Sequence, residues 1–317
     1  MHNFRVLNYY LVMTKKTHLF SNLKSDFASG LVVFLVALPL CLGIALASGA
    51  PLFSGIISGV IGGIVVGYLS QSHISVSGPA AGLTAIVLVA ITDLGSFNAF
   101  LLAGLIAGCI QLVLGFVKAG SISNYFPNNV IEGMLAGIGV IIFLKQIPHA
   151  VGLDKDYFGD LSFFQEDGKN TFSEITGIFQ DMQIGSLIIT VVSLAILLIW
   201  NRVDVLKKIK LVPAALVAVI IGICLNELFI YLDNGFAVSA DHLVKLPLPQ
   251  NLDELAAIIV FPEFTAITNS KVWIVGLTIA IVASIETLLC IEAADRMDAQ
   301  KRYTDTNVEL KAQGIGN

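Results

Sequence analysis

The chain carries little charge for its length. Only 13% of its 317 residues are Asp, Glu, Lys or Arg, whereas 56% are hydrophobic, and the mean hydropathy is +0.85. That composition has too much apolar surface for one soluble core, and several apolar runs approach or exceed the length of about 18 residues that a membrane helix needs. The sequence therefore predicts an all-α polytopic membrane protein. The net charge of −5 gives no indication of a nucleic acid partner.

The sequence also lacks the motifs of metal and nucleophilic chemistry. The four cysteines lie within apolar runs, where a lone thiol acts as a small hydrophobe, and the five histidines have no metal-ligand spacing. We find no hydrolytic triad and no phosphate-binding loop. We therefore expect no enzyme activity, no metal and no organic cofactor, and a transporter of this composition would use ion gradients rather than ATP.

Hydropathy indicates eight membrane segments. They are 28–48, 52–70, 79–92, 98–117, 130–147, 185–200, 211–232 and 272–293. Lys and Arg gather in segment 1–27 and in every second loop, whereas the long loops 148–184 and 233–271 are mostly acidic. By the positive-inside rule, the amino terminus is cytoplasmic and both long loops face outside. The first segment is too long for a signal peptide, so we expect a multi-pass protein of the plasma (inner) membrane.

The stretch ISVSGPAAGLT, residues 74–84, predicts a break inside the membrane. The apolar run that follows makes about 21 Å of helix against a hydrocarbon core of about 30 Å, so it cannot cross alone. Residues 74–77 alternate between β-branched apolar residues and serine, which suits an extended segment that supplies the missing length. The residue before a proline also avoids the helical conformation. The third span is therefore expected to be discontinuous.

A helix that starts inside the membrane leaves backbone N–H groups uncovered. Pro79 suits the first helical position, which would leave the N–H groups of Ala80, Ala81 and Gly82 free to face a small cavity. Their partial positive charge suits an anion. The alternative is a Gly-Pro kink that merely ends a packed helix.

One acidic residue, Glu286, lies deep in the eighth segment, about 21 Å along the helix from Val272. Its own helical face carries Ala283, Thr287 and Cys290, and the opposite face carries Ile281, Ile285 and Leu288. The side chain should therefore point into the protein, where desolvation favours the neutral form of a carboxylic acid. This suits a proton carrier or a cation ligand. A structural carboxyl group bonded to a neighbouring helix is the alternative.

Glycine spacing predicts how the second segment packs. Gly55, Gly59, Gly63 and Gly67 recur at every fourth residue, with Gly62 beside them, which indicates one continuous face for a neighbouring backbone.

Six short motifs are distributed along the chain. They are Ala37-Leu38-Pro39, Gly43-Ile44-Ala45, Ala47-Ser48-Gly49, Val76-Ser77-Gly78-Pro79, Glu309-Leu310 and Gln313-Gly314-Ile315-Gly316-Asn317. Together they resemble the SulP inorganic anion transporters, the sulfate permease family, over nearly the whole chain. The resemblance implies a 7+7 inverted-repeat fold, with an anion between the half-helices of the third and tenth spans. It also implies a homodimer and, in many members, a STAS domain.

The same resemblance implies that the chain is truncated after the start of the ninth span. Residues 1–27 would be a cytoplasmic segment, 28–232 the first seven-span repeat, 233–271 an extracytoplasmic loop and 272–317 the incomplete start of the second repeat. The functional expectations below therefore concern a longer parent protein.

By position, the resemblance also implies the site residues. Those at the anion site would be Leu40, Ile44, Ser77, Gly78, Pro79, Ala80 and Ala81, and Glu286 with Thr287 would lie at the coupling position. In sodium-driven bicarbonate members an aspartate stands there, with a threonine four residues later and another after the Gly-Pro. Here those places hold Glu286, Cys290 and Ala80, which favours protons as the coupling ion, with sodium as the alternative.

The expected function is secondary active transport of an inorganic anion, sulfate or bicarbonate, in a lipid membrane. A nucleobase permease of the same fold, a passive anion channel and a non-transporting membrane scaffold are the alternatives. The sequence leaves the choice of anion and of coupling ion open.

Residues 1–317 expressed alone should aggregate or be degraded and should accumulate no anion. Without a second repeat, the opened backbone before Pro79 faces lipid, where each unsatisfied polar group costs several kcal/mol. Co-expression with the second half should rescue folding, as measured by detergent-soluble yield. Anion uptake by reconstituted 1–317 alone would refute this expectation.

Overall fold

The computed structural model describes residues 23–125, 127–153, 170–172, 175–176, 182–207, 212–233, 235–238, 251 and 258–317. Most of segment 1–27, and large parts of the two long loops predicted to face outside, lie outside these described residues. Their domain boundaries therefore stay predictions. The first helix already begins at Leu23, inside the segment that was predicted to precede the membrane.

All eight predicted segments are helical in the structure. They correspond to α2 (Leu23–Ala47), α3 (Leu52–Ile61) continued by η1 (Gly62–Val66) and α4 (Gly67–Leu69), η2 (Ala81–Leu83) with α5 (Thr84–Leu94), α6 (Phe97–Phe116), α7 (Asn128–Ala150), α9 (Ile184–Arg202), α11 (Ala214–Leu232) and α13 (Ser270–Met297). Shorter elements are η3 (Ala119–Tyr125), α10 (Asp204–Lys207), η5 (Phe264–Thr268) and the closing helix α14 (Thr306–Gly316). Among the described residues, six helices are long and apolar enough to cross a membrane. The predicted all-α polytopic membrane architecture is confirmed.

Local signals explain where several helices begin and end. Ser96 caps α6 by accepting a hydrogen bond from the Ala99 N–H, and Asn269 caps α13 through the Lys271 N–H. Gly95 ends α5 in the left-handed conformation, with φ of 73°, which a glycine adopts without steric cost. These caps define the ends of helices that lie around the site.

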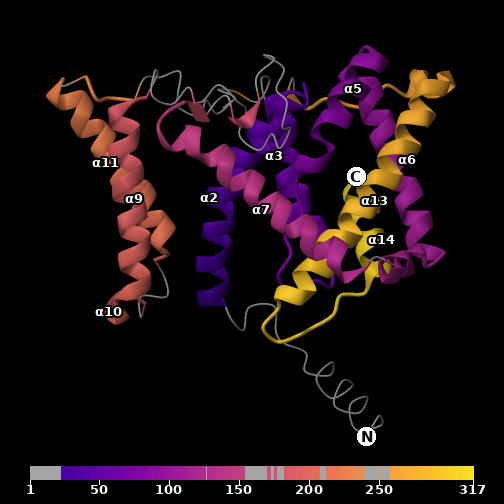
Figure 1. Ribbon diagram of the computed structural model, residues 1–317. Helices are drawn as coiled ribbons and strands as arrows, with labels where there is room; N and C mark the ends of the chain where they lie inside the picture. Colours follow the sequence, from indigo (N-terminus) through magenta and orange to yellow (C-terminus); the bar gives the residue numbers. More distant parts are fainter. Residues whose placement is uncertain are drawn as a thin grey trace, which may run out of the picture.

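The densest packing surrounds α6, which contacts α13 and α14 along its length (Figure 1). Leu102, Ala103 and Ile106 of α6 form a buried cluster with Val272 of α13. The α9–α11 pair lies at the opposite end of the molecule, with α2, α3 and α7 between (Figure 1). The well-packed part of the described structure therefore lies around the third, fourth and eighth spans.

Glycine lets α14 approach α6 very closely. A Cβ at Gly108 would lie 2.8 Å from the carbonyl oxygen of Gly314, and a Cβ at Gly314 would lie 2.8 Å from the carbonyl oxygen of Gly108. Neither position tolerates a side chain without a shift of backbone. The reciprocal contact seats α14 against the centre of α6.

A polar turn between α13 and α14 orients the closing helix. The buried Asp295 carboxylate accepts hydrogen bonds from the Thr304 N–H and hydroxyl, both at 2.7 Å. Asp298 accepts from Arg302 Nε at 2.8 Å, and the hydrogen bonds from Arg302 hold the pKa of Asp298 well below its usual range. Asp305 then caps α14 through the N–H groups of Asn307 and Val308.

The continuous glycine face predicted for the second span is wrong. Gly55 and Gly59 do pack on α2, against Cys41, but a Cβ at Gly63 would meet nothing within 4 Å. The physical reason is helical geometry: at 3.6 residues per turn, a four-residue repeat drifts by about 40° at each step, so Gly63 lies about 80° from Gly55 around the axis. Gly62, seven residues after Gly55, returns to within about 20° of it. Gly62, rather than Gly63, then faces the neighbouring segment.

Gly62→Ala and Gly63→Ala form a matched pair of variants that should behave in opposite ways. A Cβ at Gly62 would collide with the Ser77 carbonyl oxygen and lie 2.9 Å from the Gly78 nitrogen, whereas Gly63 has open space. We expect Gly62→Ala to lower the thermal midpoint of the detergent-solubilised protein. Gly63→Ala should leave it unchanged or raise it, because alanine favours the helix over glycine by roughly 0.5–1 kcal/mol. Equal midpoints in the two variants would contradict this account of how Gly62 packs.

Candidate functional site

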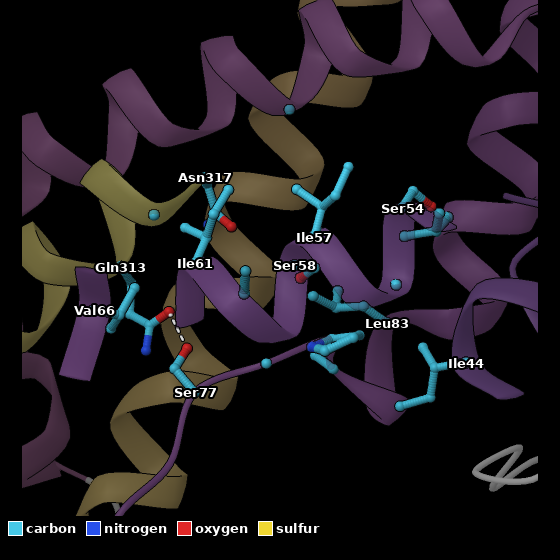
Figure 2. Close-up of a pocket in the computed structure, with 18 of the residues that line it drawn as sticks. Ile44, Ser54, Ile57, Ser58, Ile61, Val66, Ser77, Leu83, Gln313 and Asn317 are labelled. Carbon is cyan, nitrogen blue, oxygen red and sulfur yellow. Dashed lines mark hydrogen bonds between the residues drawn. The ribbon is translucent and has the colours of Figure 1, made fainter. Parts of the chain in front are cut away.

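A cavity of about 550 Å³ lies where the second, third and eighth spans meet α14. One wall is α3, from Ser54 to Ile61, and the opposite wall is the extended segment that leads from Ser75 into η2. Figure 2 shows Ser77 and Gln313 at one end of this cavity, and Ile44 and Leu83 at the other. Most of the lining is small and apolar, with hydroxyl and amide groups set into it.

The third span is discontinuous, as predicted, but its helix starts later than expected. Ala80 is still extended, with φ of −92° and ψ of 117°, a 3₁₀ turn follows, and the α-helix begins at Thr84. Pro79 is therefore not the first helical residue. The physical reason is tertiary: the Ser77 backbone lies against Gly62 and keeps the chain extended past the proline, which overrides the local preference.

The start of this helix faces the acidic residue of the eighth span. The Glu286 carboxylate lies directly against Gly82 at the start of this helix. A Cβ at Gly82 would lie 2.7 Å from Glu286 Oε1, so only glycine leaves room for the carboxylate at this place. A helix start with a free N–H is a natural position for a negative group. Glu286 thus occupies part of the region that we predicted for an anion.

Most of the predicted site residues lie on this one cavity. Its lining includes Ile44, Ser77, Gly78, Pro79, Ala80, Glu286 and Thr287. Leu40 and Ala81 are not part of the lining formed by the described residues. Leu40 lies about one turn before Ile44 on α2, and Ala81 opens the 3₁₀ turn, so both are neighbours of the cavity rather than walls of it.

The predicted orientation of Glu286 agrees with the structure. Ala283, Thr287 and Cys290 line the cavity beside it. On the far face, Ile281 is 47% exposed and Ile285 39% exposed. Leu288, which we had assigned to that outward face, is only 2% exposed and was wrongly placed. The helix α13 is covered by neighbours on more than one side, so the apolar face read from the sequence is wider than the lipid-facing one.

Sequence analysis missed a polar stripe on α14. Glu309, Gln313 and Asn317 follow at i, i+4 and i+8, and all three line the cavity. The Glu309 carboxylate accepts from Ser70 Oγ and from Gln313 Nε2, the latter at 2.9 Å. Asn317 Nδ2 donates to Gln111 Oε1 at 2.6 Å. The four-residue spacing of these polar side chains is visible in the sequence and indicates one helical face. The sequence analysis treated the three residues only as part of the family motifs and predicted no role for them in the site.

The lining suits a small charged solute rather than a metal. Among the described residues, no group of three or more His, Cys, Asp or Glu side chains could hold a metal ion. The polar groups are instead hydroxyls, amides and a helix start, together with two carboxylates on different walls. Such a set can bind an anion through N–H groups and can hold or release a proton at a carboxylate.

All eight predicted membrane segments are helical, and one of them is interrupted beside a mainly apolar cavity that holds a few polar groups. This arrangement is typical of a multi-span membrane transporter. Residues 23–317 match the model of the sulfate permease family, and the chain belongs to that family of transporters. This confirms the resemblance found in the motifs and the expectation that the protein is not an enzyme.

Known relatives agree with this assignment. The chain is 30% identical over 294 residues to "Putative sulfate transporter YvdB" of Bacillus subtilis, covering 93% of this chain and 51% of that protein. It is 24% identical over 313 residues to the bicarbonate transporter BicA of Picosynechococcus, covering 96% and 51%. The chain thus spans about half the length of the curated relatives it matches.

A solved structure shows the same fold. The transmembrane domain of a cyanobacterial bicarbonate transporter BicA superposes with a TM-score of 0.57 at 24% sequence identity, and the match covers 94% of this chain and 71% of that one.

Ala80→Phe should block the cavity without unfolding the protein. Ala80 is a wall residue, so a phenyl ring there would fill space next to the helix start, and we expect at least about a tenfold loss of anion uptake. Val89→Phe is the matched control, because Val89 lies on α5 in the same span and is 58% exposed. Uptake by the full transporter carrying each variant is measured in vesicles that contain equal amounts of protein. Equal uptake by the two variants would show that this cavity is not the transport site.

Proposed function

We propose that the transporter containing this chain moves an inorganic oxyanion, sulfate or bicarbonate, by secondary active transport with the proton as its coupling ion. The observation that carries the proposal is the position of the Glu286 carboxylate, which lies against Gly82 at the start of the third helix and lines the same cavity. The names of the relatives, sulfate transporter and bicarbonate transporter, supply the two candidate anions.

Competition for the helix start gives a physical basis for coupling. An oxyanion and an ionised Glu286 are both negative and seek the same N–H group. Two unit charges about 4 Å apart repel by about 4 kcal/mol at an effective dielectric constant near 20, equivalent to a factor of roughly 1,000 in affinity. Proton transfer to Glu286 removes this repulsion and frees the N–H. Anion and proton are then bound together and released together.

Sodium is the second candidate for the coupling ion. Oxygen ligands suit such a hard cation, and Glu286 and Thr287 could supply two. Cys290, one turn further along the same wall, offers a thiol, which is a poor ligand for hard cations. The composition of this wall therefore supports the proton over sodium.

A nucleobase permease is less well supported than an anion carrier. The cavity does hold an amide, Gln313, near the third span, but that amide already bonds to Ser77 and Glu309. Membership of the sulfate permease family also favours an inorganic anion.

Topology and assembly complete the proposal. The charge pattern of the loops supports a cytoplasmic amino terminus in the plasma (inner) membrane, and the family resemblance supports a homodimer.

Glu286→Gln should uncouple transport from the proton gradient. The amide keeps the shape of the side chain but cannot take up and release a proton, so stimulation of uptake by an inward proton gradient should disappear. The KM for the anion should change by less than about threefold, because the neutral amide mimics the protonated acid. Radiolabelled sulfate and bicarbonate uptake is measured in vesicles containing the full transporter, with proton and sodium gradients imposed separately.

Glu292→Gln is the matched control for this experiment. Glu292 lies on the same helix but pairs with Arg296 at 3.3 Å and is not among the described lining residues of the cavity. Its variant should keep the response to the proton gradient. A normal proton response in Glu286→Gln would assign Glu286 to structure, and a response to sodium alone in the unmodified transporter would favour the sodium-coupled alternative. Equilibration without accumulation would indicate a channel.

A further inference from the structure

A chain of hydrogen bonds runs along the cavity wall from the second span to the third. Ser70 Oγ donates to one oxygen of Glu309, and Gln313 Nε2 donates to the other, Oε1, at 2.9 Å. Ser77 Oγ in turn donates to Gln313 Oε1 at 3.0 Å (Figure 2). All four side chains line the cavity, and Glu309 is only 2% exposed.

The direction of each bond in this chain follows from Glu309. The Oε1 atom of the Glu309 carboxylate accepts a hydrogen bond from Gln313. The group of Gln313 that faces Glu309 must therefore be the NH₂. The amide oxygen of Gln313 then faces Ser77, and it can only accept. The single hydrogen of the Ser77 hydroxyl is consequently used within the protein.

A serine hydroxyl has one hydrogen and two lone pairs, so Ser77 offers the cavity acceptor capacity only. A fully deprotonated oxyanion such as sulfate has no hydrogen to give and would place its lone pairs against those of Ser77. Bicarbonate carries an O–H that can donate to Ser77 while its negative oxygens face the helix start. Polar groups that match one substrate and oppose another are an effective basis for discrimination.

We propose that Glu309, acting through Gln313, holds the Ser77 hydroxyl as an acceptor toward the cavity, and that this selects an oxyanion bearing its own O–H over one that bears none. Glu309 and Gln313 are positioning residues, and Ser77 is the residue that contacts the substrate. This inference rests on the proposed anion transport at the same site.

Selectivity is measured as the concentrations of sulfate and of bicarbonate that half-inhibit uptake of labelled bicarbonate by vesicles containing the full transporter. Glu309→Met removes the carboxylate that accepts from the Gln313 NH₂, so the Gln313 amide can rotate away from its present orientation. The Ser77 hydroxyl is then free to donate its hydrogen to an anion in the cavity. The ratio of the two concentrations should shift by about tenfold in favour of sulfate. Glu309→Gln keeps an oxygen for the Gln313 NH₂ and should stay within about threefold of the unmodified ratio. A merely structural role for Glu309 would lower uptake but leave the ratio unchanged, which would overturn the proposal.

Ser77→Ala provides the decisive second variant, because it removes only one hydroxyl and does not disturb the buried acid. It should abolish the preference for bicarbonate, and Glu309→Met should have no further effect on the ratio in that background. An unchanged ratio in Ser77→Ala would overturn the inference. If the unmodified transporter requires sodium and Ser77→Ala loses that requirement while the ratio stays unchanged, the inference would also be overturned. The Ser77 oxygen would then bind a cation rather than the O–H of the anion.

The experiment also separates this inference from the function on which it rests. A full transporter that carries neither bicarbonate nor sulfate would refute the proposed function. A transporter that carries bicarbonate, but whose ratio ignores Ser77 and Glu309, would refute only the selectivity mechanism.

Discussion

The contact between the Ser77 backbone and Gly62 holds the extended segment in place, and the position of the third helix start at the cavity depends on it. A discontinuous span exposes peptide groups inside the membrane, and the absence of a side chain at Gly62 lets the extended segment press against the second span. Gly62 is the glycine of the second span that faces this segment, whereas a Cβ at Gly63 would meet nothing within 4 Å. With the segment held extended, the third helix starts beside the cavity and exposes its first N–H groups there.

The two carboxylates of the cavity have different surroundings and therefore suit different roles. Glu286 lies against Gly82 at a helix start, where a substrate anion would also bind, so the proposed transport cycle has the charge of Glu286 change. Glu309 is nearly fully buried and accepts from Ser70 and Gln313, so it suits a constant role in orienting neighbours. In the proposed function, Glu286 couples a proton to the anion, and Glu309 orients the groups that recognise the anion by hydrogen bonds.

The placement of α14 connects these features to the packed centre of the molecule. The reciprocal contact of Gly108 with Gly314 seats the helix on α6, and the Asp295 and Asp298 turn sets its direction. Because Glu309, Gln313 and Asn317 share one face, that seating brings a polar stripe to the second, third and fourth spans at once. Close backbone packing and polar recognition therefore depend on the same glycine contact.

Composition and local pattern were sufficient to predict the membrane class, the eight helical segments, the break before Pro79 and the inward side of Glu286. These properties follow from hydropathy, from the length that a bilayer requires and from helical periodicity, all of which are local. Tertiary structure decided four other features: the actual start of the third helix, the packing of Gly62 against Ser77, the burial of Leu288, and the hydrogen bonds that join Glu309 through Gln313 to Ser77. Each of these features depends on which segments of the chain pack against each other. Residues that are separated in the sequence, such as Gly62 and Ser77 or Ser77 and Gln313, come into contact only when the helices pack.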